Sequence, residues 1–340
     1  MAWLLVSRST RFKDEAKKSK LSKVFTLCDV RLHAVCWGLV FFLFSPLSTF
    51  AAIEPNWENQ DACFIQPAEC VKQLKTKLSK TPKHSHKWYG IKNTYLLALW
   101  ELSTDTELKA ELDSVDIAHA PPVFLTTVYT LKAKFAVFEK DMTTARVYAE
   151  RAVSLTKAVN EVSDNMSRNA EIVVLYSSYL KDHERAKAFV DWVEQKQGLK
   201  PNPVQMATFN TAVGHLYSNN GQFGLARSYY LRALEGYLAT DYKVRIAKSY
   251  HNVARCLQRE HKFDDAIEYY TSSLTFFQEL GEQYIETGEY TRLRFAETLL
   301  ESGRMPQAKF VFSQINVDSL SDYYISFYRD IKSRLEKPTL

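Results

Sequence analysis

Alanine recurs along most of the chain at an almost constant interval, and this repeat limits the folds open to it. The alanines concerned are Ala145, Ala186, Ala226, Ala266 and Ala308, which lie 41, 40, 40 and 42 residues apart. Each stands in a similar frame of small and aromatic residues. A period of this length is typical of arrays in which a unit buries its apolar face only against its neighbours. The chain is therefore expected to fold as a stack of similar units.

The clearest unit predicts two helices joined by a turn. Gly214 is followed by an aromatic residue three positions later, by Ala226 twelve positions later and by Tyr230 four positions beyond that. Small residues let two antiparallel helices approach closely, and the large rings fill the space between one pair and the next. The segments Asn219-Asn220-Gly221-Gln222 and Glu301-Ser302-Gly303-Arg304 supply the turn between the helices of a unit.

Composition agrees with an all-α fold. The 340 residues include only ten Gly and ten Pro, with 46% hydrophobic and 24% charged residues. This composition is typical of a globular protein, but it is poor in the turn residues that a protein of many strands needs.

These units resemble the tetratricopeptide-repeat family over roughly residues 125–316. The period of 40–42 residues, in place of the usual 34, is similar to the longer-helix variant of some bacterial peptide-responsive regulators and sensor domains. The resemblance implies an α-α superhelical solenoid of helical hairpins, a repeat domain over residues 87–336. Residues 87–115 are expected to form a degenerate first unit and residues 319–336 a capping helix.

In that family the first helix of each unit lines a concave groove that holds an extended peptide or a helix of another protein. The resemblance places eight side chains there: His215, Asn219, Lys248, His251, Asn252, Arg255, Arg259 and Arg294. Cations and amides suit an acidic or carboxylate-bearing partner. Lys248, Asn252 and Arg294 partly resemble the carboxylate clamps of some members, although Thr211 and His215 occupy two of the expected clamp positions. The alternative is a solvated polar face with no specific ligand, whose histidines hydrogen-bond locally.

Motifs that would indicate catalysis are missing from the sequence. It has no Gly-rich phosphate loop, no GxSxG elbow, no HExxH and no Cys/His pairs at zinc spacing. We therefore expect no enzyme, no metal and no cofactor. Nucleic acid is an unsuitable partner, because residues 1–51 hold eight basic and three acidic residues and so account for the whole formal charge of +5.

The N-terminus has the pattern of an export signal. Residues 34–52 contain no ionisable group and follow the basic stretch, and small residues come at their end. Residues 1–51 are expected to be a cleaved signal peptide, or an anchor in the inner membrane, since nineteen apolar residues approach the roughly 20 that span a bilayer. A buried core helix is the third reading. Both of the first two place the body of the protein in the periplasm or outside the cell, with membrane contact only through an uncleaved segment.

Residues 52–86 separate this segment from the repeats. Cys63 and Cys70 flank residues 64–69, and a disulfide between them would join a short loop to the start of a helix that begins near Pro67. In an oxidising compartment this disulfide is expected. The alternative is two unrelated thiols. Residues 80–86 are interpreted as a linker.

Three functions remain open on these grounds. The leading one is an exported bacterial scaffold that binds a protein or peptide in the groove. The second is a sensor or regulatory subunit that signals through a separate membrane partner. The third is an enzyme whose site has no recognisable motif.

Overall fold

The computed structural model describes residue 63 and residues 67–102, 105–161, 165–196 and 202–336. The described residues all belong to the second of the chain's two units, Pro55–Leu340. Residues 1–51, with the predicted signal or anchor, lie outside the described residues. Every helix below belongs to the second unit.

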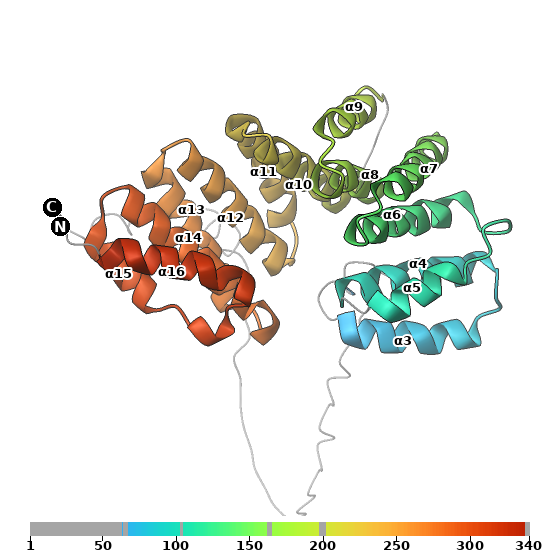
Figure 1. Ribbon diagram of the computed structural model, residues 1–340, viewed down its shortest axis with the longest axis horizontal. Helices are drawn as coiled ribbons and strands as arrows, with labels where there is room; N and C mark the ends of the chain where they lie inside the picture. Colours follow the sequence, from blue (N-terminus) through green and yellow to red (C-terminus); the bar gives the residue numbers. More distant parts are fainter. Residues whose placement is uncertain (1–62, 64–66, 103–104, 162–164, 197–201, 337–340) are drawn as a thin grey trace, which may run out of the picture. The chain divides into compact units, whose positions relative to one another are not determined.

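The described residues form helices and no strand, and this confirms the all-α prediction (Figure 1). In chain order the first half contains α3 (Pro67–Lys80), α4 (His86–Glu101), α5 (Asp105–Asp113), α6 (Pro122–Phe138), α7 (Met142–Asn160), α8 (Met166–Val174), η2 (Leu175–Tyr179) and α9 (His183–Glu194). The second half contains α10 (Pro203–Asn219), α11 (Phe223–Leu238), α12 (Lys243–Arg259), α13 (Phe263–Gln278), η3 (Glu282–Tyr284), α14 (Ile285–Glu301), α15 (Met305–Ser313), η4 (Val317–Ser319) and α16 (Asp322–Glu336).

Successive helices pack as pairs, and each pair packs on the next. The pairs are α4 with α5, α6 with α7, α8 and η2 with α9, α10 with α11, α12 with α13, and α14 with α15. Between pairs, α8 packs on α10, α11 on α12 and α13 on α14. This is an α-α solenoid of hairpins, as predicted. α4 packs on α3 as well as on α5, and α16 packs on α14 and α15.

The five repeat alanines occupy one structural position. Each is the fourth residue of the second helix of its pair, and each is fully buried. Because a methyl group takes little room, the two helices of a pair can approach closely at that point. Tyr270, which follows Ala266 by one helical turn, is also fully buried and fills the adjoining space.

The turns inside the pairs repeat as regularly as the alanines. Five residues before each alanine, the backbone has a positive φ, at Lys140, Lys181, Gly221, His261 and Gly303. The next residue donates its N–H back to a carbonyl in the last turn of the first helix, as Gln222 does to Tyr217 over 2.9 Å. This is the Schellman type of helix ending, which satisfies carbonyls that would otherwise lack a donor. The predicted turns at 219–222 and 301–304 are confirmed.

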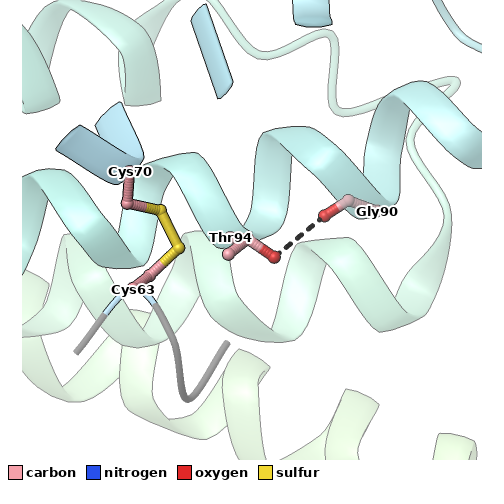
Figure 2. Close-up of a disulfide and its surroundings, with 4 residues drawn as sticks. All are labelled: Cys63, Cys70, Gly90 and Thr94. Carbon is pink, nitrogen blue, oxygen red and sulfur yellow. Dashed lines mark hydrogen bonds between the residues drawn. A yellow bond between two sulfur atoms is a disulfide. The ribbon is translucent and has the colours of Figure 1, made fainter. Parts of the chain in front are cut away.

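The segment before the repeats is held against them. α3 packs on α4, and residues 81–85 connect the two helices. A disulfide joins Cys70, near the start of α3, to Cys63, with their Cα atoms 5.2 Å apart. Figure 2 shows the disulfide beside Thr94 of α4, whose hydroxyl donates to the Gly90 carbonyl over 3.3 Å. Cys256 is free and buried.

Candidate functional site

One face of α10, α12 and α14, the first helices of three successive pairs, carries most of the predicted binding residues. We call it the first-helix face. Side chains on neighbouring helices meet across it: His251 of α12 lies with its Nδ1 3.0 Å from Thr291 Oγ1 of α14, and Arg255 of α12 donates to Glu297 of α14 over 3.0 Å. The predicted positions therefore do share a surface.

Both histidines of this face are hydrogen-bonded within the protein. His215 Nδ1 lies 2.7 Å from the Tyr230 hydroxyl, and the ring of His251 packs edge-on against Tyr270. Burial lowers the pKa of His215 to about 4, and the positive charge of Lys248 adds to the effect. Burial lowers the pKa of His251 to about 3, aided by Arg294 and Arg255. Both rings are therefore neutral at pH 7, and the local hydrogen bonding considered above is what the structure shows.

Two of the predicted arginines are engaged in a network centred on Glu297. Arg255 and Arg294 each donate to its Oε2 over 3.0 Å, and Gln258 donates to the same atom over 3.0 Å. Arg294 also donates to the Tyr290 hydroxyl and lies 4.0 Å from the centre of the Phe327 ring. These charge-assisted bonds hold the pKa of Glu297 below its usual value although burial opposes them. The two guanidinium groups are thus fixed in place by the protein itself.

Lys248 differs from those arginines. It lies on α12 one turn before Asn252, is exposed, and has no ion pair or hydrogen bond with any residue that the structure describes. Surrounding protein nevertheless desolvates its ammonium group and lowers its pKa, opposed by the negative charge of Glu101 at the end of α4. Asn252 is half-buried, and its amide is likewise unpaired among the described residues.

The remaining predicted residues lie at the ends of helices. Asn219 is the last residue of α10 and is exposed. Arg259 is the last residue of α12 and is exposed, with its guanidinium 5.1 Å from the centre of the Phe223 ring. No contact among the described residues joins Asn219 or Arg259 to Lys248.

A hollow that the sequence did not predict lies among α4, α6 and α8, which are earlier first helices of the same stack. Its volume is about 110 Å³, and Asn93 and Glu171 are among its lining residues. The first unit lacks the repeat alanine, so its register could not be read from the sequence.

Neither metal nor membrane features are found within the described ranges. No group of three or more His, Cys, Asp or Glu side chains there is placed to hold a metal ion. None of the helices described is both long and apolar enough to cross a bilayer.

Comparison with known proteins supports the repeat assignment. Residues 205–279 match the family model described as tetratricopeptide repeat. Regulatory protein RapK of Bacillus subtilis is 24% identical over 130 residues, which span 38% of this chain and 35% of RapK.

Solved structures show the same fold. Aspartyl phosphate phosphatase F from Bacillus subtilis aligns over 82% of this chain and 78% of its own, with 13% identity and a TM-score of 0.55. PilW, a widely conserved type IV pilus biogenesis factor, aligns over 73% of this chain and 100% of its own, with 16% identity and a TM-score of 0.52. Residues 205–279 are thus tetratricopeptide repeats, and they form part of an α-α solenoid of helical hairpins.

Proposed function

We propose that this chain is an exported scaffold that binds a protein or peptide partner on its first-helix face, and that Lys248 receives a carboxylate of that partner. The tetratricopeptide fold supports the binding role. The observation that carries the proposal is the state of Lys248, an exposed cation that is partly desolvated by the surrounding protein and has no ion pair among the described residues.

The energetics favour an anionic partner at this point. Desolvation penalises a charge until an opposite charge or an acceptor compensates for it. Arg255 and Arg294 have that compensation from Glu297, whereas Glu101 acts on Lys248 only at a distance beyond an ion pair. A bound carboxylate would supply what Lys248 lacks, and a charge-assisted bond of this kind contributes roughly 1.5–3 kcal/mol.

A regulatory subunit that acts through a separate membrane partner is the second candidate. It is favoured by the similarity to a protein named as regulatory, RapK, although the aligned stretch covers only about a third of that protein. In both candidates the chain binds a partner and performs no catalysis of its own.

An immobilised library of random heptapeptides, half with a free C-terminal carboxylate and half amidated, would test the proposal. We expect the wild-type protein to bind a subset of peptides enriched in free or side-chain carboxylates. Lys248→Gln, which removes the charge, should weaken that subset about tenfold or more, in line with the loss of one charge-assisted bond.

Lys309→Gln is the matched control. Lys309 is exposed on α15, a second helix, and the exchange removes the same charge away from the first-helix face. It should leave binding unchanged. Equal losses of peptide binding in the two variants would indicate a general charge effect. If Lys248→Gln bound the peptides as well as wild type, Lys248 would not be part of the binding site.

A further inference from the structure

The hollow among α4, α6 and α8 has walls that suit a short apolar stem. Leu97 of α4 and Val123 and Leu131 of α6 line it, and Val123 is 48% exposed. Its volume of about 110 Å³ is smaller than the ~150 Å³ cavity that accommodates benzene. It can therefore hold one side chain of moderate size, but not the backbone of a peptide.

Asn93, in the wall of this hollow, has a side-chain oxygen that lacks a partner among the described residues. Its Oδ1 is buried and accepts no hydrogen bond from any of them. A buried acceptor left unpaired is costly, and a donor that reaches it recovers that free energy. Since the χ2 torsion of Asn is broad and two-fold, the amide can turn its oxygen toward a donor in the hollow.

Other groups of the wall also present acceptors. The hydroxyls of Thr126 and Thr130 both line the hollow, and both donate their hydrogens to carbonyls of their own helix, Thr126 to Val123 over 2.7 Å and Thr130 to Thr126 over 2.8 Å. Each oxygen therefore keeps lone pairs for a ligand N–H and has no hydrogen left to donate.

The charged residues in the wall of the hollow do not favour a cationic ligand. Glu171, the carboxylate of the hollow, accepts a bond of 2.7 Å from Lys134, whose side chain is almost wholly buried. Arg168, which also lines the hollow, donates to Asn160 Oδ1 over 3.1 Å, so its guanidinium is engaged within the protein. A ligand with N–H donors but no charge fits this balance best, and its carbonyl oxygen suits the side of Arg168.

We infer that this hollow, the Asn93 pocket, is a subsite for a primary carboxamide, the side chain of a glutamine or asparagine in the bound peptide. The inference rests on the proposed peptide-binding function. A carboxamide supplies two N–H donors for the acceptors of the wall and one carbonyl oxygen, and its methylene stem lies against Leu97 and Leu131.

A positional peptide set tests it. Heptapeptides that bind the wild-type protein are resynthesised with each position in turn changed to Gln, Glu, Met or Lys, which have similar lengths but differ in polarity and charge. At one position we expect Gln to bind at least fivefold more tightly than the other three. Asn93→Leu should abolish this preference while Met peptides bind as before, and Asn220→Leu, the same exchange at an exposed residue after α10, should preserve it.

A small probe separates failure of the pocket from failure of the proposed function. Propionamide, propionate and propylammonium are titrated separately while the side-chain amide resonance of Asn93 is followed by NMR. We expect propionamide to shift that resonance saturably, and the two charged probes to bind at least fivefold more weakly.

The outcomes are distinct. If no peptide binds the wild-type protein but propionamide still binds at Asn93, the proposed function fails and the pocket stands. If peptides bind without a Gln preference, or propylammonium binds as well as propionamide, the carboxamide assignment is overturned while peptide binding stands.

Discussion

Individual side chains on the first-helix face differ in whether the protein already satisfies them. His215, His251, Arg255 and Arg294 all have partners within the protein, whereas Lys248 has no direct partner among the described residues. A residue of the first kind shapes and stiffens the surface, because its rotamer is fixed before any ligand arrives. A residue of the second kind retains bonding capacity for a ligand.

The two neutral histidines predict how stability depends on pH. Their pKa values of about 4 and about 3 in the folded protein lie below the ~6.5 of an unfolded chain. Above pH 6.5 both histidines are neutral in the folded and in the unfolded protein, so they do not change the free energy of unfolding. As the pH falls below 6.5, the unfolded chain binds protons that the folded protein excludes, so the free energy of unfolding decreases by at most about 1.4 kcal/mol per pH unit for each histidine.

Urea unfolding at pH 7, 6 and 5 measures this effect. Wild type should lose stability over that range, and His251→Gln should lose less, because it removes one of the two groups that must protonate on unfolding. Parallel losses in wild type and variant would show that His251 is not held neutral.

At the scale of the elements, the turn within each pair is a common device with variable chemistry. Two of the five left-handed positions are glycine, which adopts a positive φ without steric cost, and three are Lys140, Lys181 and His261. For a residue with a Cβ, this conformation costs roughly 1–2 kcal/mol. Glycine also loses about 0.5–1 kcal/mol through greater freedom in the unfolded chain.

Lys181→Gly should therefore raise the free energy of unfolding by about 0.5–1 kcal/mol, and Gly221→Ala should lower it by about 1 kcal/mol. Asn220→Gly is the control, because Asn220 has a φ of −93° and gains nothing from glycine, so that only the entropic loss remains. Thermal and urea unfolding measure all three. A destabilised Lys181→Gly variant would refute this account of the turn.

The same turns show what could be predicted from the sequence. The alanine period identified the pairs, and Gly221 and Gly303 identified two turns, but a lysine or histidine does not by its own residue type indicate a left-handed position. Counting five residues back from each repeat alanine would have found them. The pairing of Arg255 with Glu297 was not predictable, because it depends on the register between α12 and α14, whereas Arg294 and Glu297 lie three residues apart on α14. Asn93 was missed because the first pair lacks the alanine that marks register.

At the scale of the whole molecule, the solenoid places its candidate sites along one row of first helices. The Asn93 pocket lies among α4, α6 and α8, and Lys248 lies on α12. The negative charge of Glu101, at the end of α4, acts on Lys248, and that of Glu171 in the pocket wall acts on Glu101. One extended ligand that used both sites would connect a carboxamide at one end to a carboxylate at the other.

Where the protein meets that ligand depends on export, which we propose from residues 34–52. This segment is uncharged and follows a basic stretch, so it should carry the repeats out of the cytoplasm whether or not it is cleaved. A fusion of alkaline phosphatase after residue 60, expressed in a bacterial host, reports on this directly, since that enzyme becomes active only where its disulfides can form.

We expect the fusion to be active, and the same fusion without residues 34–52 to be inactive at equal expression. The size and membrane association of the active fusion distinguish a cleaved signal from an uncleaved anchor. Cleavage shortens the product by about 51 residues and releases it from the membrane, whereas an anchor leaves the product at full length and sedimenting with membranes. An inactive fusion at residue 60 would refute the export proposal. The peptide partner would then have to be sought in the cytoplasm, and the Cys63–Cys70 disulfide would face a reducing environment in which such bonds rarely persist.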